Sequence, residues 1–360
     1  MPQITPQPGI MEIDLYVGGK SSIAGRDDVL KLSSNENPLG PSPVALDALV
    51  AAASGAHRYP STDHAELRAA IGEVHGLDPE RIICGVGSDE VLQFVCQAYA
   101  GPGDEIIHTE HGFSMYPILA HMAGATPIKV PERNRVVDVD LVLAAITDRT
   151  RVIFITNPGN PTGTILPDGA LERLVAAVPE HVIVVLDGAY TEFADGHDGG
   201  VTLADTRPNV LMTRTFSKIY GLGGLRIGWG YGAKELIDVL NRIRQPFNLS
   251  VVQLAAGEAA VRDQDWVHEC ARLNADQRAR LTGALRQLGI ACDDSFGNFV
   301  LARFASEAEA LAADAALQDD GIIVRRVGGY GFPEGLRITI GDEAMTGRVI
   351  AALNRWREGA

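Results

Sequence analysis

Lys218 is the residue of this chain whose neighbours are best suited to covalent chemistry. It lies in residues 214–229, RTFSKIYGLGGLRIGW, where Arg226 follows it by eight residues with small and glycine residues between them. A lysine amine can form a Schiff base with an aldehyde, and Ser217 and Arg226 can hold a phosphate. This set predicts an enzyme that uses pyridoxal 5'-phosphate (PLP), while a surface lysine near glycines is the plain alternative.

Asp187 ends the most hydrophobic run of the chain, residues 182–186. A carboxylate at the end of a buried strand is costly unless it has a cationic or proton-donating partner. A protonated pyridine nitrogen is such a partner, and a ring kept cationic by Asp187 stabilises a carbanion at the substrate α-carbon. The alternative is a strand-end aspartate that caps the next turn.

Asn160 and Tyr190 are the candidates for contacting the oxygen of a pyridine ring. Asn160 lies in a proline- and glycine-rich turn, residues 157–163 (NPGNPTG), and Tyr190 follows Asp187 by three residues. Two donors to this oxygen stabilise the phenolate and lower the pKa of a Schiff base at Lys218. They would leave the imine free to accept a substrate proton.

Residues 85–90, GVGSDE, precede a helical pattern and predict a phosphate cradle. Glycines before a helix expose backbone N–H groups, and the helix dipole favours an anion there. Ser88 and Asp89 are the candidate contacts. An ordinary N-cap formed by the Ser-Asp pair is equally compatible with these residues.

Two further groups of residues could complete a pocket. Among the aromatic residues, Phe113 could stack on a pyridine ring, Tyr116 could line the substrate pocket, and Tyr59 is ambiguous between site and core. Arg325 and Arg337 lie in strand-like runs, where a guanidinium needs an anion such as a carboxylate or phosphate. Exposed strand positions are the alternative for both arginines.

The elements that must position these residues follow an α/β pattern. Strand-like runs at 105–108, 151–155, 181–186 and 209–213 alternate with helical patterns, which predicts a mostly parallel sheet covered by helices on both faces. Ligands bind such sheets at the carboxyl ends of the strands, where Asn160, Asp187 and Lys218 fall. Arg226 is expected in a further strand, 225–229.

The C-terminal third predicts a smaller α+β domain. A long helical stretch, 250–288, precedes short strands at 299–302, 322–325 and 336–340 and helices at 306–317 and 344–357. We therefore divide the chain into an N-terminal arm or small-domain segment (1–35), a large domain (36–247) and a small domain (248–360).

Composition excludes several classes of function. The chain has 360 residues, 46% of them hydrophobic, and a formal net charge of -15, which argues against nucleic acid and anionic membranes as partners. It lacks an apolar run of about 18 residues and a signal-like N-terminus, so we expect a cytoplasmic protein. Its four cysteines are scattered and form no C-x-x-C pair, so no metal site or disulfide framework is predicted.

The order of these motifs resembles fold-type I aminotransferases, and within them it is most similar to the histidinol-phosphate aminotransferase family. The resemblance spans nearly the whole chain. Gly188 and Gly159 depart from the D-E-A-Y and N-P-N-N-P patterns of many relatives. The matching motifs are N-E-N-P (35–38), R-Y-P (58–60), G-S-D-E (87–90), N-P-x-N-P-T-G (157–163), D-x-A-Y (187–190), S-K (217–218), G-L-R (224–226) and L-R-I-T (336–339).

The resemblance implies a large PLP-binding domain, a smaller α+β domain and a role for each matching residue. Lys218 would be the Schiff-base lysine and proton shuttle, and Asp187 would contact the ring nitrogen. Arg337 would bind the carboxylate of glutamate. The other implied contacts are Asn160 and Tyr190 at the ring oxygen, Phe113 at the ring face, Ser88, Asp89, Ser217 and Arg226 at the cofactor phosphate, Tyr59 at a phosphate across a dimer interface, and Tyr16, Asn37, Asn248 and Arg325 in the substrate pocket.

The implied reaction is a ping-pong transamination between histidinol phosphate and 2-oxoglutarate, in a homodimer, as a step of histidine biosynthesis. Three alternatives stay open at this point. The chain could be an aminotransferase for aromatic amino acids, or a PLP-dependent decarboxylase of a phosphorylated amino acid. It could also be a PLP-sensing module without catalysis, although no segment of the acidic chain suggests a DNA-binding partner.

Overall fold

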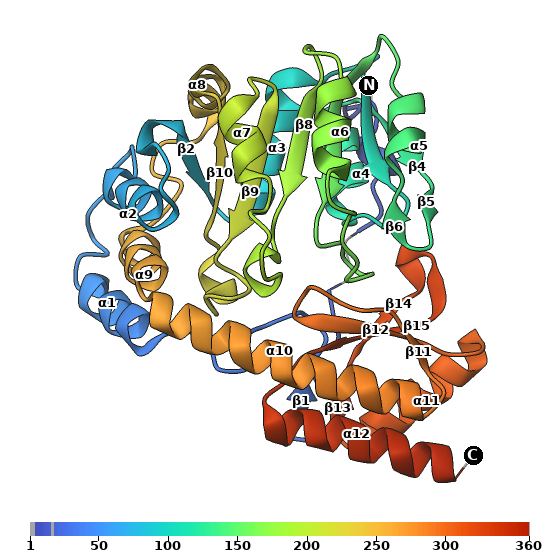
Figure 1. The fold of residues 1–360 in the computed structure, drawn as a ribbon. Helices are drawn as coiled ribbons and strands as arrows, with labels where there is room; N and C mark the ends of the chain where they lie inside the picture. Colours follow the sequence, from blue (N-terminus) through green and yellow to red (C-terminus); the bar gives the residue numbers. More distant parts are fainter. Residues whose placement is uncertain (1–3, 16–17, 360) are drawn as a thin grey trace.

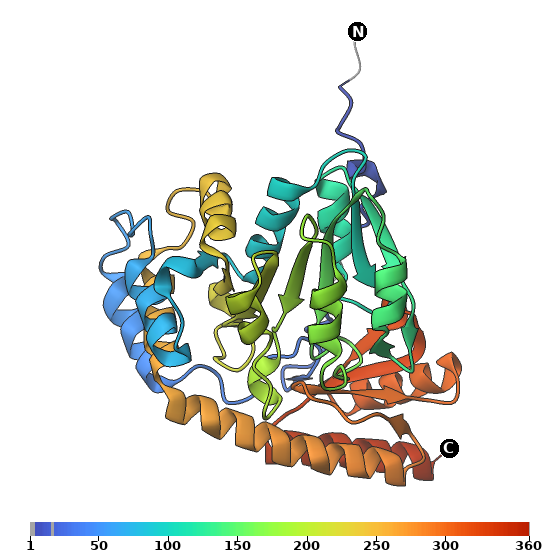
Figure 2. The same cartoon turned by 45° about the horizontal axis from the view of Figure 1, so that its top comes forward.

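The computed structural model describes residues 4–15 and 18–359. Figure 1 shows a large part built on a central sheet, a smaller part below it, and the long helix α10 (Gln264–Gln287) running along their boundary. The view in Figure 2 shows that the beginning of the described chain, with the short turn η1 (Ile10–Glu12), lies against the large part, at the end away from the small one.

The central sheet has seven strands and is mostly parallel, as predicted. Strand β10 runs antiparallel to both of its neighbours, β2 and β9, while the pairs β9–β8, β8–β7, β7–β3 and β3–β4 are parallel. The strands, in spatial order, are β2 (Ile82–Gly85), β10 (Gly228–Gly232), β9 (Val210–Thr215), β8 (Ile183–Asp187), β7 (Thr150–Thr156), β3 (Glu105–Thr109) and β4 (Thr126–Val130).

Helices cover both faces of this sheet. Successive side chains of a strand point to opposite faces, so each strand contributes side chains to both cores. In β7, Val152 and Phe154 pack with one group of helices, and Ile153 and Ile155 pack with the other. The first group is α3 (Ser88–Tyr99), α4 (Met115–Met122) and α8 (Lys234–Ile243). The second is α1 (Pro43–Ala53), α2 (Ala65–His75), α5 (Val139–Ala144), α6 (Ala170–Ala177), α7 (Val201–Thr206) and α9 (Val251–Arg262).

The small part is an antiparallel sheet covered by helices. Its core also includes Leu30 and Leu32 from the N-terminal segment, whose strand β1 (Leu30–Lys31) pairs in parallel with β13 (Ile322–Ile323). The elements of this part, in sheet order and then chain order, are β11 (Ala291–Cys292), β12 (Phe299–Arg303), β15 (Phe332–Thr339), β14 (Arg325–Val327), α11 (Glu307–Asp319) and α12 (Glu343–Glu358).

The helical stretch predicted over 250–288 is two helices. Asp263 ends α9 and caps α10, since its side chain accepts a hydrogen bond from the Trp266 N–H. Helix α9 packs against α1 and α2, and along α10 the buried residues change from the large core at Cys270 to the small core at Leu281. We therefore propose that the division between the two parts falls inside α10 rather than at residue 248.

Two strand predictions need correction. Arg226 precedes β10, which begins at Gly228, and its left-handed backbone (φ 53°) ends the short turn η4 (Gly223–Leu225). The run 322–325 is split between β13 and β14 at Val324. The remaining elements are η1 (Ile10–Glu12), η2 (Pro79–Arg81), β5 (Glu132–Arg133), β6 (Val136–Val137), η3 (Thr191–Phe193) and η5 (Gly328–Tyr330).

Within residues 4–15 and 18–359, no helix combines the length and apolar character needed to cross a bilayer.

Candidate active site

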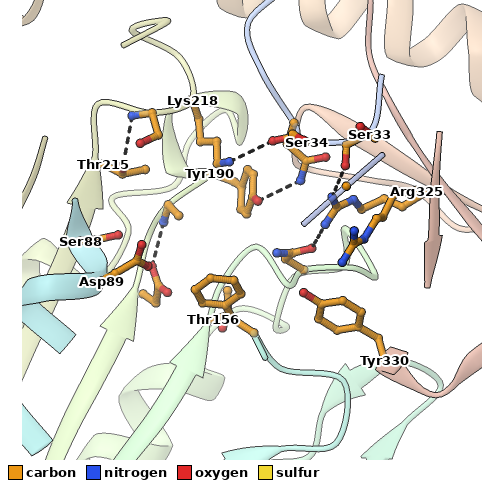
Figure 3. A pocket seen from close by; sticks show the side chains of 18 of the residues that line it. Ser33, Ser34, Ser88, Asp89, Thr156, Tyr190, Thr215, Lys218, Arg325 and Tyr330 are labelled. Carbon is orange, nitrogen blue, oxygen red and sulfur yellow. Dashed lines mark hydrogen bonds between the residues drawn. The ribbon is translucent and has the colours of Figure 1, made fainter. Parts of the chain in front are cut away.

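A pocket lies at the edge of the central sheet where the parallel strands end. Thr156 ends β7, Asp187 ends β8, and Lys218 follows β9 by three residues. The register pairs Thr156 with Asp187 and Asp187 with Thr213, so these strand ends are neighbours. Because β10 is antiparallel, Arg226 at its start returns to the same edge, and Figure 3 shows side chains from all these elements converging on one space.

Lys218 points its amine into this pocket. The Nζ lies 3.4 Å from the backbone oxygen of Ser34 and 5.7 Å from the centre of the Tyr190 ring. Burial lowers the pKa of Lys218 to about 8, and the positive charge of Arg337 adds to this effect. A larger fraction of the amine is therefore neutral near neutral pH than in an exposed lysine.

Asp187 is buried at the floor of the pocket. Its Oδ2 accepts a hydrogen bond from the Tyr116 hydroxyl at 2.7 Å, and its Oδ1 faces the Ala189 N–H at 3.3 Å and the Thr213 hydroxyl at 3.4 Å. Burial raises the pKa of Asp187 to about 6, and the hydrogen bond from Tyr116 opposes that rise. A cation beside Asp187 would therefore stabilise the ionised form of this carboxylate.

Tyr190 and Asn160 are each held by a buried hydrogen bond to another residue of the lining. The Asn35 side-chain amide donates to the Tyr190 hydroxyl at 2.9 Å. Arg337 donates to Asn160 Oδ1 at 2.6 Å and to the Ser33 backbone oxygen at 3.0 Å. Because the Asn160 oxygen is engaged by a guanidinium, its NH₂ group is the part left to act as a donor.

The start of α3 forms one wall of the pocket. Its N-cap is Gly87 (φ 78°), with no side-chain cap, so the alternative of a Ser88 or Asp89 N-cap is wrong. A Cβ at Gly87 would lie 2.7 Å from Arg226 Nη2, and a Cβ at Gly228 would lie 2.0 Å from the Ser88 backbone nitrogen. Glycines at both positions allow helix, strand and guanidinium to come together, at a helix start of the kind that can bind an anion.

Arg226 links the loop that carries Ser217 to the start of α3. Its Nη1 donates to the Ser217 hydroxyl and its Nη2 to Asp89 Oδ2, each at 3.0 Å. Glu90 supports the loop from below, since its Oε2 accepts hydrogen bonds from the Val86 N–H and the Asn248 amide, each at 2.7 Å.

Arg325 and Arg337 are direct cross-strand partners in the register of β14 and β15. Guanidinium groups placed on adjacent strands in this way can pair with one carboxylate or phosphate. Both side chains line the pocket, and Arg337 is buried. Figure 3 shows Arg325 and Tyr330 on the side of the pocket opposite Ser88 and Asp89.

Most of the residues predicted from the sequence line this pocket. The geometry differs from expectation at Tyr116, which is fully buried and contacts Asp187 from below rather than lining the substrate space. The predicted residues in the lining are Ser88, Asp89, Phe113, Asn160, Asp187, Tyr190, Ser217, Lys218, Arg226, Arg325 and Arg337.

Three other predicted residues lie elsewhere. Asn37 donates to the Ile219 backbone oxygen and to the sulfur of Cys270, and Asn248 contacts Glu90, so both support the structure outside the lining. Tyr59 is 83% exposed and outside the pocket of its own chain. Tyr16 falls outside the described residues.

The sequence reasoning missed several lining residues, among them Ser33, Ser34, Asn35, Thr156 and Tyr330. Thr156 could have been found from the sequence, because it directly follows the predicted strand 151–155, as Asp187 follows 181–186. Tyr330 and the segment 33–35 reach the pocket only through the packing of the small part against the large one.

The two departures from the family pattern have local explanations. A Cβ at Gly188 would lie 2.6 Å from the buried Thr191 hydroxyl, and a Cβ at Gly159 would lie 2.6 Å from the Thr162 hydroxyl. Each glycine therefore accommodates a threonine three residues later in the chain.

Comparison with known proteins agrees with this geometry. Residues 27–353 match the family model for aminotransferase class I and II. The chain is 66% identical over 358 residues to a histidinol-phosphate aminotransferase of Ruegeria pomeroyi, covering 99% of each, and 63% identical over 350 residues to one of Jannaschia sp., covering 97% of each.

Solved structures show the same fold. The histidinol-phosphate aminotransferase of Sinorhizobium meliloti, in complex with pyridoxal-5'-phosphate, matches with a TM-score of 0.87 and 29% identity over 93% of this chain and 92% of that one. A Thermus thermophilus aspartate aminotransferase double mutant matches with a TM-score of 0.81 and 25% identity, covering 92% of each chain. The predicted fold class is confirmed.

Proposed function

Since this chain belongs to the class I and II aminotransferase family, we propose that it is a PLP-dependent enzyme that transfers an amino group between histidinol phosphate and 2-oxoglutarate. The observation with the greatest weight is one pocket in which Lys218, Asp187 and an anion-binding helix start face two arginines. The full-length relatives named for this activity support the choice of substrate.

The residues of the pocket fit PLP. Asp187 is a buried carboxylate with a raised pKa, so a protonated pyridine nitrogen would be a stabilising partner for it. The glycines at 87 and 228 leave the start of α3 open to a phosphate, with Ser88, Asp89, Ser217 and Arg226 around it. When bound, PLP supplies a ring that withdraws electrons from the α-carbon of an amino substrate.

Lys218 is the base in this proposal. Its lowered pKa makes the neutral amine available to take a proton from the substrate α-carbon and to return it to the cofactor carbon C4′, which would carry the amino group afterwards. Asn160 and Tyr190 would donate to the ring oxygen, and Phe113 would cover a face of the ring. Asp187 would hold the ring nitrogen in its protonated form.

Arg325 and Arg337 explain how one pocket could serve two different substrates. Glutamate has two carboxylates, whereas histidinol phosphate has a phosphate and no carboxylate. A guanidinium pairs with either anion through the same fork of N–H donors. The two arginines lie opposite each other on adjacent strands and line the same pocket, so one anion could pair with both.

The test is a comparison of three amino donors. Purified protein loaded with PLP should transfer the amino group of histidinol phosphate to 2-oxoglutarate at a higher kcat/KM than that of phenylalanine, and should not release CO₂ from phosphothreonine. Lys218→Ala should remove the activity and the absorbance of the lysine-bound cofactor. A preference for phenylalanine, or decarboxylation of phosphothreonine, would replace the proposed substrate with one of these alternatives.

We further propose that the enzyme is a homodimer in which Tyr59 reaches the cofactor phosphate of the partner subunit. Tyr59 is 83% exposed and stacks on Phe247 with ring centres 4.6 Å apart, and Val44 and Val50 of α1 are also exposed. Mixing Lys218→Ala with Tyr59→Ala subunits tests this arrangement. Recovery of activity above that of either variant alone is expected, because one site of a mixed dimer would then be intact.

A further inference from the structure

The small part contributes an aromatic side chain to the pocket that the proposed function does not use. Tyr330 ends the turn η5 between β14 and β15, and its half-buried ring lines the cavity. Phe113, Tyr190 and Tyr330 are the aromatic residues in the described lining. The first is expected at the cofactor ring, and the second is held by Asn35.

The backbone at Tyr330 is held independently of its hydroxyl. Its carbonyl oxygen lies 2.7 Å from His111 Nδ1 of the large part. The His111 ring also packs on Phe332 with centres 4.1 Å apart. Gly331 (φ 88°) fits closely here, since a Cβ would lie 3.2 Å from His111 Cε1. The backbone that carries the Tyr330 ring is therefore held by contacts that do not involve its hydroxyl group.

The Tyr330 hydroxyl forms a pair with a serine that has an unusual role. Ser114 is the N-cap of α4, a position where serine usually accepts a hydrogen bond from the helix backbone. Here Ser114 makes no such cap, and its Oγ lies 3.2 Å from the Tyr330 hydroxyl. Either oxygen can donate in this pair, so one hydroxyl proton and several lone pairs are left for a ligand.

We propose that Tyr330 recognises the imidazole end of histidinol phosphate, and so distinguishes this donor from glutamate. This inference rests on the proposed function. An imidazole has a flat face and ring nitrogens that can donate or accept a hydrogen bond, which match the ring and the hydroxyl group of Tyr330, and the Tyr330 hydroxyl contacts Ser114 behind it. Glutamate offers none of these groups, and its two carboxylates are met by Arg325 and Arg337.

The amino-bearing carbon of the donor must lie near Lys218, and its phosphate must reach an arginine. The residues assigned so far then leave the imidazole ring of the donor without a binding partner in the pocket. Tyr330 and Arg325 lie on the same side of the pocket in Figure 3, across from Ser88 and Asp89. A donor whose phosphate pairs with Arg325 therefore occupies the same side of the pocket as Tyr330.

The experiment measures the two half-reactions separately. Enzyme loaded with PLP is mixed with histidinol phosphate alone, or with glutamate alone, and conversion of the cofactor to its amino form is followed by absorbance. Tyr330→Phe should lower the second-order rate constant for histidinol phosphate about 10-fold, the value of a hydrogen bond in a pocket, and change that for glutamate by less than about 2-fold. Tyr330→Leu, which also removes the ring, should give a larger selective loss.

Two controls separate recognition from a general effect. Tyr99→Phe alters a tyrosine at the far end of α3 and should leave both half-reactions unchanged. Ser114→Ala keeps the Tyr330 hydroxyl and should slow the histidinol phosphate half-reaction less than Tyr330→Phe does. Unfolding temperature and cofactor absorbance should match the wild type in each variant.

Equal losses with both donors, or no loss in Tyr330→Phe, would overturn the role of Tyr330 while leaving the proposed function intact. Failure of the wild-type enzyme to react with histidinol phosphate, while it reacts with glutamate, would overturn both.

Discussion

The Tyr116 hydroxyl donates a hydrogen bond to Oδ2 of Asp187 at 2.7 Å, and the same hydroxyl lies 2.5 Å from Thr156 Oγ1. Burial, followed by the charge of Asp187, raises the pKa of Tyr116 well above its usual value. Tyr116 therefore remains a donor throughout the working pH range. Its role is to hold a buried carboxylate that is expected to face the cofactor.

Tyr116→Phe should weaken PLP binding by about 10-fold, because Asp187 loses a buried donor and its ionised form becomes less favourable. Titration of the cofactor-free protein with PLP, followed by absorbance, measures the change. Tyr231→Phe is a matched control, since Tyr231 also donates to an aspartate, Asp205, at 2.6 Å but lies away from the pocket. Equal effects of the two variants would contradict a specific role for Tyr116.

Asp187→Asn should stabilise the cofactor-free protein while removing activity. The folded protein raises the pKa of Asp187 from 3.8 to about 6, so it binds this proton more tightly than the unfolded chain does. That contribution to stability is present at low pH and is lost as the pH rises through about 6. The variant should therefore unfold about 2 to 4 °C higher near pH 7.5, from a difference on the order of 2 kcal/mol.

The same comparison near pH 5 should show a much smaller difference, because Asp187 is then mostly protonated in the folded wild type. Added PLP should reverse the order at the higher pH by stabilising the wild type more than the variant. A constant difference between the two proteins at both pH values would contradict the assignment to Asp187.

The positions of Lys218, Asp187 and Asn160 could be predicted because each follows a recognisable strand. Parallel strands end at one edge of a sheet, so a one-dimensional pattern was enough to bring these residues together. Arg226 was also predicted in the site, although its strand begins three residues later than expected. The fold class followed from the same alternation of strands and helices.

The roles of Tyr116 and Asn248 could not be predicted in this way. Tyr116 is the second residue of α4, and its side chain points under the pocket because the helix packs on Phe154 of the sheet. Asn248 reaches Glu90 across 158 positions of the chain. The direction in which each of these side chains points depends on tertiary packing. The presence of Asn35 and Tyr330 in the pocket depends on how the small part packs against the large one.

Uptake of PLP by the cofactor-free protein should become faster as the pH rises, with a midpoint near 8. The neutral amine of Lys218 is the reactive form, and burial and Arg337 lower the pKa of Lys218 from 10.5 to about 8. Arg337→Met removes one cause of this shift and should move the midpoint upward. Arg325→Met is the matched control, because the Arg325 charge is not among the main causes of the shift at Lys218.

Asn248 should govern the affinity for the phosphate of the cofactor without touching it. Its amide donates to Glu90 Oε2, which also accepts the Val86 N–H and so fixes the loop that leads into α3. Asn248→Ala removes one donor and should weaken PLP binding about 10-fold. Asn248→Asp places a second carboxylate beside Glu90 and should weaken it further, since like charges at short range repel.

Pyridoxal, which lacks the phosphate, distinguishes this role from a general loss of structure. Both Asn248 variants should bind pyridoxal as the wild type does, because the distorted segment contacts only the phosphate. Equal losses for PLP and pyridoxal would instead indicate that Asn248 supports the whole pocket, and would contradict its specific action through Glu90 and the start of α3.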